Sequence, residues 1–372
     1  MDTNALGNVD RSISACFARN YVEARDKFLA VAQDSGGSLR AYTNPNLGPQ
    51  GEALATDTAW FGPADAERVL VLVSATHGVE GFTGSAAQID WLREGGPARL
   101  PAGLAALLIH AINPYGFAWL RRVTEEGVDL NRNFVDFSRP LPENPGYDEL
   151  ASALVPPELS GPLFDAAEAR IQAYRDMHGE REFQIARGGG QYRHPGGLFF
   201  GGMGPTWSRR TTEAIVSENR LAQRKAVGVV DFHTALGPFG YGEPICGHDP
   251  GTPANERVKA WCGESVTEPA MGTSSSVPKV GLSQQGWQRL LGDRVTFVTL
   301  EFGTYAMDRG RRALREDHWL HNRGPFEWDN PEVQRIKTQI RRHFFPDSDD
   351  WKEMVLVRGR QIVRQAVLGL AI

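Results

Sequence analysis

The chain has 372 residues, of which 41% are hydrophobic and 23% are charged. This composition is typical of a globular protein, and the length suffices for one large α/β domain or two smaller ones. The 40 basic and 45 acidic residues give a formal charge of −5, and no basic block along the chain matches a phosphate backbone. We therefore expect no nucleic-acid partner.

The sequence predicts a soluble, cytoplasmic protein that does not enter a membrane. Residues 1–21 carry several charges and contain no apolar run of the length that a signal peptide needs. No stretch approaches the ~20 continuous apolar residues of a membrane-spanning helix. The three cysteines, Cys16, Cys246 and Cys262, lack CxxC spacing, which argues against a disulfide framework and a cysteine zinc site. Nothing in the sequence indicates an oligomeric state.

The first expected elements are a helix and a strand. Apolar residues at 21–33 have helical spacing, and we expect an N-terminal helix at about residues 18–34. A short strand at residues 38–42 and turn-forming residues at 44–51 follow it. Further along, four runs rich in Val, Leu and Ile barely alternate with polar residues, as expected of strands covered on both faces. These runs are residues 69–74, 107–112, 227–232 and 295–300.

Helical patterns separate and follow these strands, notably at residues 211–225 and at about 349–370. The glycine-rich residues 188–204 predict a long ordered loop, because the aromatic residues in it argue against disorder. The alternation of elements predicts an α/β sandwich with a mostly parallel or mixed central sheet. No repeat or clear linker divides the chain, so residues 1–372 are expected to form a single domain with the two terminal helices packed on it.

Polar residues stand directly after three of the four buried strands. His77 and Glu80 follow the first strand, His233 follows the third, and Glu301 follows the last. Because ligands of open α/β sheets bind beyond the carboxyl ends of the strands, these side chains are expected to converge. Two histidines and one glutamate form a donor set typical of catalytic zinc with an open position for water. Glu301 is then available as the carboxylate that takes a proton from the zinc-activated water.

The HxxE pair alone is a weak signal, because a histidine and a glutamate on a polar surface loop can have the same spacing. Gly78 and Gly81 flank the pair and would let the backbone turn tightly enough for both side chains to reach one ion. The segment at residues 113–134 strengthens the metal interpretation, because arginines can bind carboxylates or stabilise an oxyanion. Alternatively, these arginines pair with acidic neighbours on a surface loop. The polar residues of interest are Arg121, Arg122, Asn131 and Arg132.

Other histidines are assigned to structural roles. His110 lies inside a predicted strand and is expected to be a core histidine with a satisfied ring. His318 and His321 have a spacing compatible with metal binding, but they lie in a charged stretch and are expected at the surface.

Taken in chain order, these motifs resemble the zinc carboxypeptidase superfamily. The similarity is greatest to its aspartoacylase and succinylglutamate desuccinylase branch and to a related group of bacterial carboxypeptidase-like proteins, and it spans about residues 69–305. The resemblance implies a three-layer α/β/α sandwich with an eight-stranded mixed, mostly parallel sheet and one zinc ion per chain. The motifs are His77-x-x-Glu80, an Asn-Pro segment with arginine, Asp129-Leu-Asn131-Arg132-Asn-Phe, Asp231-Phe-His233-Thr and Leu300-Glu301-Phe-Gly.

The resemblance also implies roles for individual residues. The zinc ligands would be His77, Glu80 and His233, with Glu301 as general base and acid. Arg122 would polarise the scissile carbonyl; because the gap to Asn131 is longer than in aspartoacylase, Arg121 is the alternative. Asn131 and Arg132 would hold the substrate carboxylate. A substrate-binding tyrosine is also implied, and the alternatives for it are Tyr192, Tyr241 and Tyr305.

The expected function is therefore zinc-dependent hydrolysis of an amide bond next to a free carboxylate, by zinc-activated water with a glutamate base. The enzyme would be of the carboxypeptidase or N-acyl-amino-acid deacylase type, acting on a small molecule or short peptide that carries a carboxylate. One alternative is a zinc-dependent esterase or amidase that acts on a small non-peptide substrate. Another is a non-catalytic binding protein of the same fold, since fold alone does not determine function.

Overall fold

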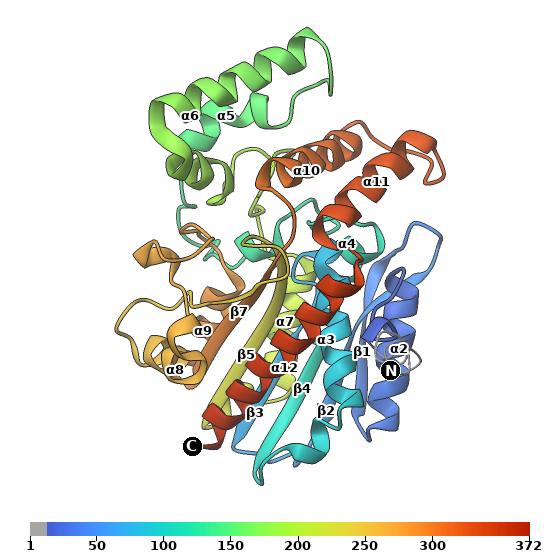
Figure 1. The fold of residues 1–372 in the computed structure, drawn as a ribbon, viewed down its shortest axis with the longest axis vertical. Coiled ribbons are helices and arrows are strands. Elements are labelled where there is room, and N and C mark those ends of the chain that lie inside the picture. Colours follow the sequence, from blue (N-terminus) through green and yellow to red (C-terminus); the bar gives the residue numbers. More distant parts are fainter. Residues whose placement is uncertain (1–12) are drawn as a thin grey trace, which may run out of the picture.

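The computed structural model describes residues 13–372 and contains a seven-stranded mixed sheet covered by helices (Figure 1). The sandwich class is as expected, although the described residues form seven strands rather than eight. Within these residues, none of the helices combines the length and apolar character that a membrane crossing requires. The expected absence of a signal peptide falls partly on residues 1–12, which lie outside the described residues.

The strand order across the sheet is β1-β2-β4-β3-β5-β7-β6. The four central strands, β4, β3, β5 and β7, are mutually parallel. Antiparallel pairs form the two sides of the sheet. The strands are β1 (Ser38–Leu47), β2 (Ala53–Phe61), β3 (Arg68–Val73), β4 (Leu104–His110), β5 (Ala226–Ala235), β6 (Gly242–Ile245) and β7 (Val295–Gly303).

Alternate residues of the central strands enter two separate cores. Leu70 and Leu72 of β3 pack with α2, α3, α8 and α12 on one face of the sheet, whereas Val69 and Val71 pack with α7 and α9 on the other. Burial on both faces explains the nearly continuous apolar runs in the sequence. The main helices are α2 (Tyr21–Asp34), α3 (Gly81–Arg93), α4 (Pro114–Ala118), α5 (Pro145–Leu154), α6 (Pro162–Gly188), α7 (Trp207–Glu218), α8 (Pro253–Cys262), α9 (Ser283–Leu291), α10 (Met307–Asn322), α11 (Pro331–Phe344) and α12 (Asp349–Ala371).

Two strands were not predicted from the sequence. The middle of β2 is polar, and Asp57 is buried there because it forms an ion pair with Arg25 of α2 at 2.6 Å. Edge strand β6 has only four residues and contains Pro244, which cannot donate a ladder hydrogen bond. Strand β1 also continues to Leu47 through an irregularity in its register, into the stretch expected to be a turn.

Helices α5, α6, α10 and α11 lie beyond the end of the sheet at which β7 leads into α10 (Figure 1). Helix α6 is long but has few buried residues, and Gly179 interrupts it with a φ of 81°, so it shows no continuous apolar stripe in the sequence. It ends at Gly188, where the predicted glycine-rich loop begins. This group of helices therefore stands over the carboxyl ends of the parallel strands.

Packing between α10 and α11 corrects the expectation for two histidines. His318 is buried and His321 is mostly buried, rather than at the surface. Burial lowers the pKa of His318 to about 4. Between the two helices, Asp317 of α10 forms an ion pair with Lys337 of α11 at 2.6 Å. The charged composition of this stretch thus reflects a buried ion pair. His110, in contrast, is buried in the core as expected, with its Nε2 2.9 Å from Ser85 Oγ, but its buried Nδ1 has no hydrogen-bond partner among the described residues, so the ring is satisfied only in part.

The loop after β3 depends on the absence of a side chain at Gly78. A Cβ at this position would lie 2.0 Å from the main-chain carbon of Gly116, so the requirement is close packing of two backbones. The main-chain nitrogens of Gly78 and Val79 donate to the carbonyls of Arg122 and Arg121, at 3.2 and 2.8 Å. These contacts hold the HxxE segment against the arginine segment.

We expect Gly78→Ala to lower the free energy of unfolding by about 2 kcal/mol, because a main-chain neighbour cannot move aside as a flexible side chain can. Gly359→Ala is the control, because a Cβ there meets only the Cβ of Ala87 at 3.8 Å in the middle of a helix. The control should be neutral or stabilising by up to about 1 kcal/mol. Denaturant unfolding measures both, and equal stability of the two variants would refute the packing argument.

Candidate functional site

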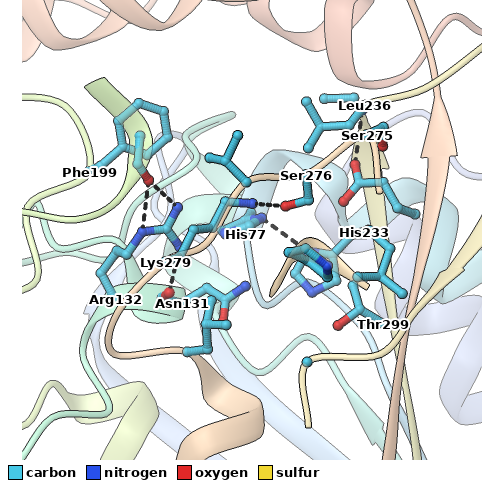
Figure 2. Close-up of a pocket in the computed structure, with 18 of the residues that line it drawn as sticks. His77, Asn131, Arg132, Phe199, His233, Leu236, Ser275, Ser276, Lys279 and Thr299 are labelled. Carbon is cyan, nitrogen blue, oxygen red and sulfur yellow. Dashed lines mark hydrogen bonds between the residues drawn. The ribbon is translucent and has the colours of Figure 1, made fainter. Parts of the chain in front are cut away.

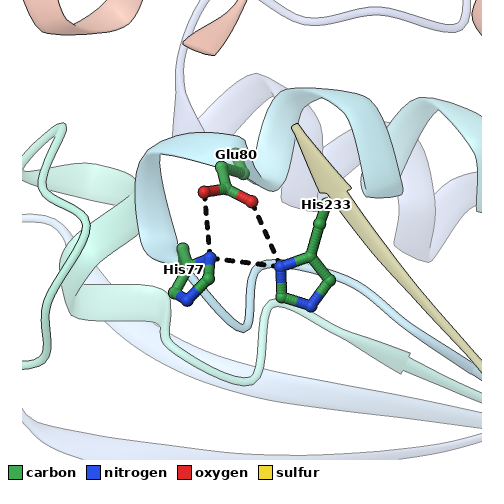
Figure 3. Close-up of side chains that lie close together, drawn as sticks. All are labelled: His77, Glu80 and His233. Atoms are coloured by element: carbon green, nitrogen blue, oxygen red, sulfur yellow. Dashed lines mark hydrogen bonds and ion pairs between the residues drawn. The ribbon is translucent and has the colours of Figure 1, made fainter. Parts of the chain in front are cut away.

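Two histidines and a glutamate from separate elements meet at the carboxyl end of the sheet (Figure 3). His77 directly precedes the short 3-10 turn Gly78–Glu80, which follows β3, and Glu80 is the last residue of that turn. His233 lies inside β5 and is paired in register with Glu301 of β7, because both strands continue further than their apolar runs indicated. The three ligand candidates are almost fully buried, with exposed fractions of 4% for His77, 1% for Glu80 and 2% for His233.

The donor atoms of this group have the spacing that a tetrahedral metal ion requires. The two Nδ1 atoms of His77 and His233 are 3.1 Å apart, and they lie 2.9 and 3.3 Å from the carboxylate oxygens of Glu80. A tetrahedral zinc ion with ligands at ~2.0–2.1 Å places its ligand atoms roughly 3.3 Å from one another. The residues present therefore fit zinc in both chemistry and geometry.

Each histidine of this group also faces a second carboxylate through its other ring nitrogen. His77 Nε2 lies 3.3 Å from Asp129, and His233 Nε2 lies 3.0 Å from Asp231. Thr76 Oγ1 donates to Asp231 at 2.8 Å and fixes that carboxylate. Such partners orient metal-binding imidazoles and raise their basicity. No role at the metal site was predicted for these aspartates, although each stands two positions before a predicted site residue.

Neighbouring charges control the ionisation of this group. Burial opposes ionisation, but Asp231 and Glu80 outweigh it and raise the pKa of His233 to about 10. Burial likewise opposes the carboxylate form of Glu80, yet His77 and His233 lower its pKa. Carboxylates thus lie beside both imidazoles, as suits a site for a cation, although the Arg122 guanidinium also lies beside His77, with its Nη2 atom 2.7 Å from His77 Nε2.

The adjacent residues Arg121 and Arg122 contact different parts of the protein. Arg122 contacts Asp129 through Nε at 2.9 Å and Glu80 through Nη1 at 3.3 Å, beside the histidines. Arg121 instead donates its Nε to Asp317 of α10 at 3.0 Å, away from the metal-ligand candidates. Of the two alternatives, only Arg122 faces the candidate metal site.

Glu301 is a buried carboxyl beside the metal-ligand candidates. One of its oxygens accepts a hydrogen bond from the main-chain nitrogen of Leu236 at 3.0 Å. Burial, and secondly the negative charge of Glu80, raise its pKa. A carboxyl with a raised pKa can both accept and return a proton near neutral pH.

Asn131 and Arg132 line a cavity that also contains the metal-ligand candidates and Glu301 (Figure 2). The Nε and Nη2 atoms of Arg132 donate to the carbonyl of Gly188 at 3.2 and 2.7 Å, and Nη1 donates to the carbonyl of Asn131 at 2.6 Å. Burial lowers the pKa of Arg132 to about 10, so the guanidinium remains charged at neutral pH. Main-chain carbonyls thus orient a positive charge toward the cavity.

The cavity has a volume of about 280 Å³ and brings together most of the predicted site residues. Tyr192 and Tyr241, proposed as substrate contacts, are not among the described residues that line it, and neither is Tyr305. The hydroxyl of Tyr192 donates to the carbonyl of Arg132 at 2.6 Å, and Tyr241 is 45% exposed. The predicted residues in the lining are His77, Glu80, Arg122, Asn131, Arg132, His233 and Glu301.

Lys279 and Arg187 are cationic residues of the cavity wall that were not predicted from the sequence, and Arg311 of α10 is a third. Lys279 donates a short hydrogen bond to Ser276 Oγ (Figure 2), and burial together with Arg132 lowers its pKa to about 7. Arg187, on the last turn of α6, also lines the cavity. No motif marks Lys279, which lies in a loop without a recognisable pattern, or Arg187, which lies in a helix that was not predicted.

Comparison with family models gives a match over residues 17–358 to a family described as "Protein of unknown function (DUF2817)". The chain belongs to the DUF2817 family. None of the curated proteins matches it.

Solved structures similar to this DUF2817 protein include carboxypeptidase A from Helicoverpa armigera, with 12% sequence identity and a TM-score of 0.50. The match covers 95% of this chain and 73% of that one, which confirms the carboxypeptidase-like fold. An aspartoacylase family protein from Mesorhizobium loti is 15% identical over 72% of this chain and 61% of its own, with a TM-score of 0.37. A succinylglutamate desuccinylase from a Silicibacter species is 12% identical over 77% and 65%, with a TM-score of 0.39.

We expect Asp231→Asn to lower the zinc affinity about 10- to 100-fold, because the amide keeps the shape but loses the charge that orients His233. Competition with a chromogenic chelator measures the affinity. Asp249→Asn is the matched control, because Asp249 also lines the cavity but contacts no ligand candidate, and it should bind zinc as the wild type does. An unchanged zinc affinity in Asp231→Asn would show that this aspartate does not support the site.

Proposed function

We propose that this chain is a zinc-dependent hydrolase that cleaves an amide bond next to a free carboxylate. One observation carries the proposal: the His77, Glu80 and His233 group, Glu301, Arg122 and the Asn131–Arg132 pair line a single small cavity. At about 280 Å³, this cavity suits a small molecule or the terminal residue of a peptide better than an internal peptide segment.

The metal site takes one zinc per chain in this proposal, held by two imidazole nitrogens and a carboxylate oxygen. Zinc bound there would supply Lewis-acid activation of the attacking water and of the substrate carbonyl. The protein groups around the site then control where the protons and charges go.

Glu301 is the group that moves the proton. It takes a proton from the attacking water and later gives it to the leaving nitrogen, so that water and amide become a carboxylic acid and an amine. Its raised pKa, caused by burial and by Glu80, allows the carboxyl to hold the proton between these two events. The hydrogen bond from Leu236 fixes one oxygen and leaves the other available to the reactants.

Arg122 and the Asn131–Arg132 pair bind the negative charges of the reaction. Arg122 is held in place by Asp129 and Glu80, so its guanidinium is oriented before the oxyanion develops on the carbonyl oxygen. Arg132 is held by main-chain carbonyls and keeps its charge for a substrate carboxylate. Both C-terminal trimming of a peptide and removal of an acyl group from an amino acid present an amide beside such a carboxylate.

We expect Glu301→Gln to bind zinc normally but to lose turnover by ~10²-fold or more, because the amide keeps the shape and cannot carry the proton. The measurement combines metal analysis with release of acid and amine from N-acyl amino acids and dipeptides. Glu80→Gln is the matched control, because it should lose metal as well as turnover. Loss of zinc in Glu301→Gln would instead make Glu301 a metal ligand.

The same assay on amidated analogues tests the carboxylate requirement. A site built to pair with a polar group can reject an analogue that lacks it by up to roughly 10⁴-fold. Arg132→Ala should lower kcat/KM for the free carboxylate and barely change the residual rate on the amide. Equal activity of the wild type on both forms would contradict the proposal and favour a general amidase or esterase.

A further inference from the structure

Arg187 is a partly buried cation with a fully buried Nε atom, and the described residues provide no anion for it. Its Nε atom is buried without a hydrogen-bond partner, and among residues 13–372 its guanidinium forms no hydrogen bond or ion pair. The rings of Phe183 and Phe199 lie beside its guanidinium, with their centroids at 5.7 and 5.9 Å. Burial and the neighbouring Arg311 lower its pKa to about 10, so it remains charged at neutral pH. A buried charge of this kind is costly unless something pairs with it.

The nearest acidic residues are already engaged elsewhere. Glu180 and Asp308 influence Arg187 through their charges. However, Glu180 pairs with Arg175 at 2.7 Å, and Asp308 lies 3.5 Å from Arg311. Both carboxylates thus already lie beside other arginines, which leaves the Arg187 guanidinium available to an anion that enters the cavity.

Three guanidinium groups gather around the ring of Phe199. Arg122, Arg132 and Arg187 lie 5.2, 5.6 and 5.9 Å from its centroid, and all of them line the same cavity. Of these three arginines, only Arg122 has carboxylate partners among the described residues. Arg132 and Arg187 therefore both face the cavity without a carboxylate partner among the described residues, so two guanidinium groups are available to anionic groups of a ligand.

We propose that Arg187 forms a second anion subsite, so that the substrate carries another carboxylate besides the one bound by Asn131 and Arg132. This inference rests on the proposed function and specifies its substrate class. The second carboxylate lies on the α6 side of the cavity, where the guanidinium can form charge-assisted hydrogen bonds with it. Helix α6 thus contributes a specificity-determining residue to a site otherwise built from the sheet and the loops beside it.

The test compares isosteric ligand pairs on the zinc-loaded Glu301→Gln protein, in which ligands persist. N-acetyl-L-glutamate against N-acetyl-L-glutamine places the second charge on the amine side of the amide. N-succinyl-L-glutamine against N-succinamoyl-L-glutamine places it on the acyl side. Calorimetry should show that, in at least one pair, the dicarboxylate binds about tenfold more tightly or better, as expected for hydrogen bonds to a charged group.

Adding Arg187→Met should reduce the affinity for the dicarboxylate to that of its amide partner and leave the amide unaffected. Arg187→Lys should keep part of the preference. Arg311→Met is the matched control, because Arg311 lines the same cavity but is paired with Glu168 at 3.1 Å, so the preference should remain. Thermal unfolding confirms that each variant is folded, and Arg187→Gln replaces the methionine variant if that one fails to fold.

Equal binding within both pairs, or a preference that survives removal of the Arg187 charge, would overturn the second subsite. If the wild type hydrolyses these compounds and Arg132→Ala weakens their binding, the proposed function stands and only the inference about Arg187 fails. If Arg132→Ala leaves the binding of all four compounds unchanged, the proposed function fails, and the second subsite with it.

Discussion

The approach of two buried imidazoles to one buried carboxylate is the constraint on which the site depends. The Nδ1 atoms of His77 and His233 lie 3.1 Å apart, with the Glu80 oxygens at 2.9 and 3.3 Å. Such a cluster is stable when a cation joins its lone pairs, and the aspartates behind the rings supply negative charge from the opposite side. Parallel pairing of β5 with β7 sets His233 opposite Glu301, so the same strand register that builds the candidate metal site also positions the proposed proton carrier.

Charge is distributed unequally around this centre. Carboxylates surround the histidines, whereas the wall formed by the arginine segment, α6 and the loop at Lys279 is cationic. Arg122 belongs to both regions, because Asp129 and Glu80 hold it beside the histidines. This separation suits a reaction in which a metal ion and Arg122 share a developing oxyanion and the remaining cations bind anionic groups of the substrate. Helices at the end of the sheet keep the cavity small, which raises the strength of each of these interactions.

Much of this site could be predicted from the sequence because its key residues follow long apolar strands. The predicted ligand set and Glu301 converge for this reason, and Arg122 faces them as the motif order implied. Other features left no such signal. Strand β2 has no apolar pattern in the sequence, because polar residues are buried in it, and α6 lacks a continuous apolar stripe. The choice between Arg121 and Arg122 depended on Asp317, far along the chain, which binds Arg121. Arg187 could not be predicted as a cavity residue, because the position of α6 over the cavity is not evident from the sequence.

The central claim is that two histidines and one glutamate hold a single zinc ion. X-ray absorption spectroscopy at the zinc edge tests it most directly, on protein loaded with one equivalent of zinc. The account predicts a shell of nitrogen and oxygen atoms at about 2.0–2.1 Å, with the outer scattering of two imidazoles, and loss of one imidazole contribution or of the metal in His233→Ala. A sulfur shell at about 2.3 Å, or a spectrum without imidazole scattering, would contradict it.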